Sequence, residues 1–203
     1  MLRRLQQARS ERRLHKALAE ADGVRLLKRL KGGCDPNSRL QDTAGNPRSL
    51  LQLAIENGHP EPVRLLLDAG AAVDDPQLLH HAMGSGPQAL RMLTLLLRAG
   101  ADPNGDAGSA FFASLEQPDS ATTQLLISRL MEHGGDVNCR DAQHGTPLRY
   151  ALLAERQELS CLLISAGATL PDGLDQLPCS DELKALARRN ARDLEVRRLL
   201  QET

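Results

Sequence analysis

The sequence contains very few aromatic residues: no Trp, one Tyr and two Phe among 203 residues. Globular cores and small-molecule pockets usually rely on aromatic side chains for buried area. Their scarcity argues against a fold built around a ligand pocket. A core of Leu, Ala, Val and Ile is more typical of thin helices that stack on one another.

The chain also lacks an excess of either charge, since 25 Lys and Arg stand against 26 Asp and Glu and leave a formal net charge of −1. This balance argues against a general nucleic-acid or membrane-surface binder. No run of about 18 apolar residues is present, so no transmembrane helix is expected. The first residues, MLRRLQQARSERRL, are charged and lack the apolar stretch of a secretory signal. We therefore expect a cytoplasmic protein that binds neither nucleic acid nor membrane.

Motifs for catalysis or metal binding are missing as well. There is no C-x-x-C pair, no H-E-x-x-H and no G-x-S-x-G. The Gly-rich stretch at 100–108 is not followed by Lys and Ser or Thr, as a phosphate-binding loop would be. We expect no catalytic residue, no metal and no cofactor. The few cysteines are expected to be structural thiols: they are Cys34, Cys139, Cys161 and Cys179.

One stretch, DAQHGTPLRYALLAERQELSCLLISAG at 141–167, has the pattern of a complete helix–turn–helix unit. Thr146 followed by Pro147 is a helix-start signal, because Thr caps free backbone N–H groups and Pro suits the first helical position. Two short apolar stripes follow, separated by polar residues. Gly167 then ends the second helix, where a positive φ is usual. Such a pair cannot bury its apolar faces alone and needs neighbours on both sides.

The unit recurs along the chain. A small residue marks each first helix (Ala17, Ala54, Ala82, Ser114 and Ala151), and a Gly ends each second helix (Gly33, Gly70, Gly100, Gly134 and Gly167). Successive Gly spacings are 37, 30, 34 and 33 residues, and the tails GCDPN, GAAVD, GADPN and GGDVN match one another. A period near 33 with two helices per unit is a specific repeat signature.

These motifs resemble the ankyrin repeat family, most clearly in HGTPLRYA at 144–151, NGHPEPVRLLLDAGA at 57–71 and LLLRAGADPN at 95–104. The resemblance implies an all-α fold, a solenoid of antiparallel helix pairs with short β-hairpin-like connecting loops. It implies about five repeats and a degenerate C-terminal capping repeat. Members of the family bind proteins through hairpin tips and inner helices and are rarely catalytic.

We expect one domain over residues 1–203, with repeats at about 10–37, 42–74, 75–104, 105–138 and 141–170 and a cap at 178–203. Ser10 is a plausible start for the first helix. The cap is expected to hold two amphipathic helices, SDELKALARRN and DLEVRRLLQ. Three segments depart from the regular unit: a long first tip at 38–49, a third hairpin at 71–78 that is cut short or absent, and a stretched fourth unit at 109–120.

The residues expected to contact a partner lie at hairpin tips or near the ends of first helices, where a repeat scaffold varies without loss of stacking. They are Arg39, Gln41, Asp42, Thr43, Glu56, Asn57, Asp75, Gln77, Ser85, Asp106, Ser109, Phe112, Glu116, Arg140, Gln143 and His144.

The sequence therefore indicates a non-enzymatic module that binds one partner protein and regulates or inhibits it, for example an immunity protein that neutralises a toxin. The free protein is expected to be monomeric. One alternative is a scaffold or self-assembling adaptor. Another is an enzyme with a shallow site beside Phe111 and Phe112 in the fourth repeat.

Overall fold

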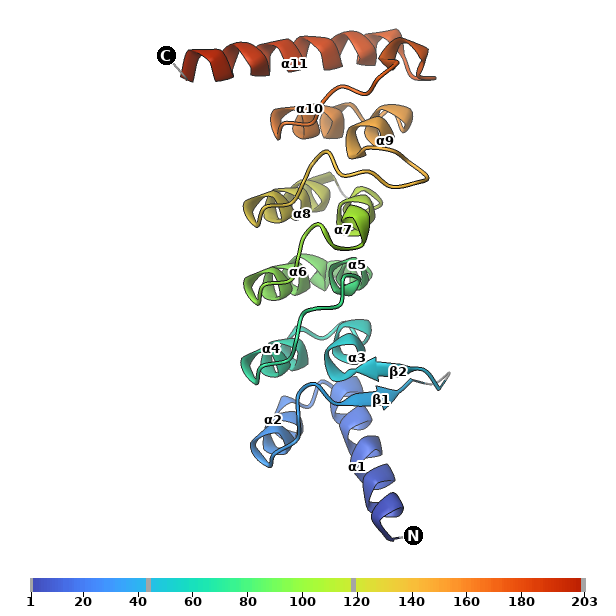
Figure 1. Cartoon of the computed structure of the whole chain (residues 1–203), viewed down its shortest axis with the longest axis vertical. Helices are drawn as coiled ribbons and strands as arrows, with labels where there is room; N and C mark the ends of the chain where they lie inside the picture. The colour runs from blue at the N-terminus through green and yellow to red at the C-terminus, as the bar shows by residue number, and fades with distance from the viewer. Residues whose placement is uncertain (1, 43–44, 118–119, 202–203) are drawn as a thin grey trace. The chain divides into compact units, whose positions relative to one another are not determined.

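The computed structural model describes residues 2–42, 45–117 and 120–201, and almost all of their regular structure is helical (Figure 1). The chain forms two compact units, Met1–Asp102 and Pro103–Thr203. The single domain expected over 1–203, and the repeat boundaries within it, stay predictions.

The first unit contains three helix pairs and a short hairpin. Its elements are α1 (Leu2–Ala19), α2 (Gly23–Lys31), β1 (Arg39–Gln41), β2 (Pro47–Ser49), α3 (Leu50–Glu56), α4 (Pro60–Asp68), α5 (Leu78–Met83), the 3₁₀ helix η1 (Gly86–Gln88) and α6 (Ala89–Arg98). Each first helix packs on the second helix of its pair. The first helices α1, α3 and α5 also pack on one another in order, as do α2, α4 and α6.

The second unit contains two helix pairs and a long final helix. Its elements are α7 (Gly105–Leu115), α8 (Ser120–Glu132), α9 (Pro147–Leu153), α10 (Gln157–Ser165), the 3₁₀ helix η2 (Leu174–Gln176) and α11 (Asp181–Gln201). Here α7 packs on α8 and α9, and α10 packs on α8, α9 and α11. Both units thus have the stacked helix pairs that the repeat pattern predicts.

A small side chain in the C-terminal half of each first helix permits this close stacking. These five side chains are at most 1% exposed: Ala17, Ala54, Ala82, Ser114 and Ala151. Larger side chains there would hold neighbouring helices apart, because protein interiors are close-packed. The core around them is mainly Leu, with Phe111 as the largest fully buried side chain.

Every second helix ends in the same way. The predicted glycines have φ values between +85° and +100°: Gly33, Gly70, Gly100, Gly134 and Gly167. The residue after each Gly donates its backbone N–H to a carbonyl in the last helical turn, as Ala71 does to Leu66 at 2.9 Å. This is the Schellman ending, which requires a left-handed residue and therefore favours Gly.

Two local expectations differ from the structure. Ser10 lies inside α1, which begins at Leu2. The two C-terminal helices are a single helix, α11, of 21 residues. No Gly or Pro stands between residues 181 and 201, so nothing interrupts the backbone hydrogen bonds. A feature that the sequence did not predict lies at the start of α7, where Asp106, Ala107 and Gly108 have positive φ and regular helix follows them.

The irregular connectors otherwise follow the sequence. Residues 38–49 carry the only strand pair described in residues 2–42, 45–117 and 120–201, with Leu40 opposite Arg48. The third connector has no strand between Ala71 and Gln77. Its shortness leaves too few residues for a hairpin.

Candidate functional site

The hairpin of the first unit presents one polar face. Along β1 the burial alternates, so Arg39 and Gln41 are exposed while Leu40 is buried. This follows from the two-residue period of a strand. Asp42 closes the tip by accepting a hydrogen bond from the backbone N–H of Asn46 at 2.8 Å. The tip side chains Arg39 and Gln41 are therefore held on an ordered strand.

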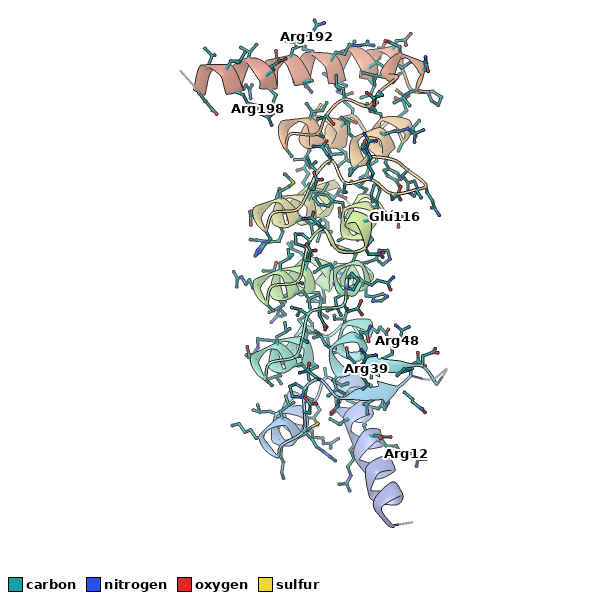
Figure 2. The ribbon with its side chains drawn as sticks, in the orientation of Figure 1. Arg12, Arg39, Arg48, Glu116, Arg192 and Arg198 are labelled. Atoms are coloured by element: carbon teal, nitrogen blue, oxygen red, sulfur yellow. The ribbon has the colours of Figure 1, made fainter. Side chains whose placement is uncertain are left out.

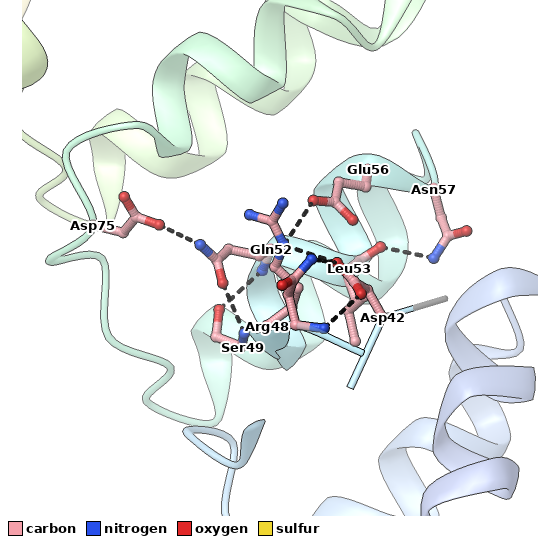
Figure 3. A network of polar contacts seen from close by, with 9 residues as sticks. Asp42, Arg48, Ser49, Gln52, Leu53, Glu56, Asn57 and Asp75 are labelled. Atoms are coloured by element: carbon pink, nitrogen blue, oxygen red, sulfur yellow. Dashed lines mark hydrogen bonds and ion pairs between the residues drawn. The ribbon is translucent and has the colours of Figure 1, made fainter. Parts of the chain in front are cut away.

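Arg48 connects this tip to the end of α3. Its Nε lies 3.4 Å from Asp42 Oδ2 and 3.8 Å from Glu56 Oε1 (Figure 3). The Arg48 side chain is one-third exposed, so each pair contributes little, about 0.2–1 kcal/mol. Their effect is to fix two predicted contact residues, Asp42 and Glu56, around one cation. Sequence reasoning missed Arg48; the hairpin register that places it opposite Leu40 was the missing information.

A second polar chain runs from the start of α3 to the next connector. Ser49 and Gln52 form a capping box, with the Ser49 N–H donating to Gln52 Oε1 at 2.8 Å and the Gln52 N–H donating to Ser49 Oγ at 3.1 Å. Gln52 Nε2 also donates to Asp75 Oδ2 (Figure 3). Asp75 in turn accepts from the backbone N–H of Gln77 at 2.9 Å. Two successive connectors of this unit are thus joined through Gln52.

The remaining predicted residues of the first unit lie at helix ends. Asn57 is exposed and follows α3, where its Nδ2 donates to the Leu53 carbonyl at 2.7 Å. Ser85 is half-buried after α5, and its Oγ is a buried atom with no hydrogen-bond partner among the described residues. Thr43 lies outside the described residues.

In the second unit, Asp141 organises the loop before α9. Its Oδ1 accepts from the backbone N–H groups of Gln143 (3.1 Å), His144 (2.5 Å) and Gly145 (3.2 Å). Its Oδ2 lies 2.7 Å from Nδ1 of His144. Burial raises the pKa of Asp141, but the hydrogen bonds and charge of His144 outweigh it and the pKa is lowered.

His144 is also enclosed by rings. It stacks on Phe112 with centroids 5.7 Å apart, and it meets Tyr150 edge-on at 5.2 Å. Phe112 is only 7% exposed, so it offers a partner little surface and acts mainly as a support for His144. The exposed residues next to His144 in this loop are Arg140, Ala142 and Gln143.

The other predicted residues of the second unit lie at the two ends of α7. Asp106 is exposed in the left-handed turn that opens the helix, and Ser109 is half-buried in the first regular turn. Glu116 is exposed at the C-cap (Figure 2).

Cys139 lies beside the left-handed turn that opens α7. Burial, together with the charges of Asp136 and Asp141, raises the pKa of its thiol to about 12. A thiol with so high a pKa is a poor nucleophile at neutral pH.

The repeats are joined by a recurring asparagine that sequence reasoning did not single out. Asn37, Asn104 and Asn138 each stand four residues after a helix-ending Gly. Their Oδ1 atoms accept from a backbone N–H of the next repeat at 2.7–2.8 Å, and their Nδ2 atoms donate to the next helix-ending Gly carbonyl at 3.1–3.4 Å. Each asparagine thereby links its own tail to the next one.

Neither a metal cluster nor a bilayer-spanning segment is found within the part of the chain that the structure describes. No three His, Cys, Asp or Glu side chains converge there, and none of the described helices is both long and apolar enough to cross a membrane. The four cysteines are free thiols.

The stacked pairs, their Schellman endings and the polar connectors define a helical repeat protein. The family model of ankyrin repeats, in three copies, matches residues 14–107, so this part of the chain consists of ankyrin repeats. Repeats of this family are general protein-protein interaction modules and typically have no enzymatic activity. No curated protein matches the chain.

Proposed function

We propose that this protein binds one partner protein through its connector tips and the ends of its first helices and inhibits that partner by covering its active surface, as an immunity protein does to a toxin. The observation that carries the proposal is the ordered polar network of the first unit, in which Arg48 holds Asp42 and Glu56 in place. Side chains fixed before binding lose less conformational entropy when a partner docks.

The same reasoning extends to the second unit considered by itself. Its contact residues would be Asp106, Ser109, Glu116, Arg140, Gln143 and His144, of which His144 is the most firmly held. The proposal includes a cytoplasmic partner and a free protein that is monomeric, and it requires neither nucleic acid nor a cofactor.

The test starts with affinity capture from native extract and identification of the dominant protein by mass spectrometry. Binding of that protein is then measured for Arg39→Ala and for Arg91→Ala, which removes another exposed arginine, from α6. We expect Arg39→Ala to weaken binding about tenfold, as for a residue at an interface centre, and Arg91→Ala to have no effect. Equal effects of the two variants, or a captured enzyme that stays fully active in the stoichiometric complex, would overturn the proposal.

One observation favours the second candidate, a self-assembling adaptor. The distal part of α11 exposes three large apolar side chains, with Val196 at 55%, Leu199 at 60% and Leu200 at 72% exposure. They lie at spacings of three and four residues, on one helical face. If a second copy covers this face, light scattering will detect a concentration-dependent dimer that Leu199→Glu abolishes. A strict monomer at high concentration excludes this candidate.

A further inference from the structure

The N-terminal pair of helices encloses a basic hollow that shares no residue with the connector tips. Its volume is about 800 Å³, within the range of ligand-binding clefts. The lining residues are Arg13 and Lys16 of α1, Arg25, Lys28 and Arg29 of α2, and Gly32, Gly33 and Cys34 of the following turn.

The charges around this hollow do not balance, although those of the whole chain nearly do. Glu20 lies 3.6 Å from Lys16 Nζ and 3.4 Å from Arg25 Nη1, and Asp22 lies 3.0 Å from Arg25 Nε. Arg13 and Lys28 line the same hollow, and neither has an ion pair with any described residue. The hollow therefore carries an excess of positive charge.

The spacing of the residues explains why they converge. Arg13 and Lys16 are three residues apart and share one face of α1, and Arg25 and Lys28 do the same on α2. Because α1 packs on α2, the two faces meet across the hollow. Cations in the last turn of a helix stabilise its C-terminus, which accounts for Lys28 in α2. It does not account for Arg13, which stands in the interior of α1. These positive charges repel one another in the free protein, and an anionic ligand in the hollow would reduce that repulsion.

We infer that this hollow is a docking site for an acidic segment, rich in Asp and Glu, of a partner protein. Three residues along a helix rise by about 4.5 Å, so the cations form two short rows that suit successive carboxylates of a peptide. Single-stranded nucleic acid is the other polyanion of suitable size, but its recognition relies on stacking against aromatic rings. Residues 1–110 contain no Phe, Tyr or Trp, which favours the acidic peptide.

The inference is tested with the full chain and a fluorescently labelled oligoglutamate peptide, by fluorescence anisotropy at about 0.05 M and about 0.3 M salt. Arg13→Gln/Lys28→Gln removes two hollow cations. Arg12→Gln/Lys31→Gln is the matched control, because it removes the same two charges from the same two helices at exposed positions outside the lining (Figure 2 labels Arg12). Circular dichroism verifies that both variants are folded.

We expect the wild type to bind oligoglutamate with an affinity that falls as salt rises. The Arg13→Gln/Lys28→Gln variant should bind about tenfold more weakly, whereas the control should change by about twofold or less. Three outcomes overturn the inference: no binding at the lower salt, an equal loss in both variants, or binding of an oligoribonucleotide that is tighter than that of oligoglutamate. The last outcome would assign the hollow to nucleic acid instead.

Discussion

The asparagine bridge between repeats is interrupted at one position, and restoring it should stabilise the protein. Asp74 stands four residues after Gly70, where the other tails carry Asn37, Asn104 and Asn138. A carboxylate accepts hydrogen bonds but cannot donate one. At the other tails, the asparagine side-chain N–H donates to the carbonyl of the next helix-ending Gly. Asp74 has no such donor for the carbonyl of Gly100. We expect the change Asp74→Asn to supply this donor.

The magnitude follows from the geometry of the intact bridges. The donated bond is the longer one, at 3.1–3.4 Å, so its net contribution lies in the lower part of the usual range, about 0.5–1 kcal/mol. For a chain of this length that corresponds to a rise of about 2–4 °C in the melting temperature for each kcal/mol. Thermal unfolding followed by circular dichroism, together with urea unfolding, measures both quantities.

The reverse change, Asn104→Asp, provides the control. It removes the bond from Nδ2 to the Gly134 carbonyl and places a carboxylate beside that oxygen, so it should cost roughly 1–2 kcal/mol. The reasoning is refuted if Asp74→Asn leaves stability unchanged or lowers it while Asn104→Asp lowers it. That result would mean that the tail at 70–74 is held by contacts other than the asparagine bridge.

Three further predictions concern the second unit. Phe111→Ala removes the largest fully buried side chain and should lower the free energy of unfolding by about 3–5 kcal/mol in urea titrations; a loss below 1 kcal/mol, on the same scale, contradicts the packing described. Asp141→Asn should cost about 1 kcal/mol at pH 7. The pKa of Asp141 is lowered in the fold, so its stabilisation is present above the unfolded pKa and is lost as the pH falls through the folded pKa. The difference in free energy of unfolding between wild type and variant should therefore shrink below about pH 4. A difference that stays constant with pH contradicts this prediction. Finally, iodoacetamide at pH 8 should alkylate Cys139 slowest of the four thiols, since a pKa of about 12 leaves very little thiolate; peptide mass spectrometry gives the order, and early labelling of Cys139 contradicts it.

The local signals in the sequence were sufficient for the framework of the fold. Thr146 accepts from the backbone N–H of Arg149 at 3.2 Å, as a predicted N-cap should. The helix-ending glycines all have positive φ. These features depend on the conformation of one residue and its near neighbours, so the residue type alone predicts them.

The candidate contact surface was only partly predictable. Arg39 and Gln41 are exposed on the tip as expected, because the strand period fixes their direction. Arg48 was not found, since its role depends on pairing across the hairpin and on the end of α3. Phe112 is buried against His144, a contact between α7 and the loop before α9 that no local pattern encodes.

The repeat unit and the asparagine bridges show most clearly what the sequence determines and what only the tertiary structure decides. By itself, the sequence determined the period, the small residue in each first helix, and the Gly that ends each second helix, because one residue's shape or φ decides each of these. Only the tertiary structure decided that Asn37, Asn104 and Asn138 bridge to the following repeat. That outcome depends on which backbone groups the neighbouring repeat leaves to be satisfied, and this becomes known only when the repeats are stacked.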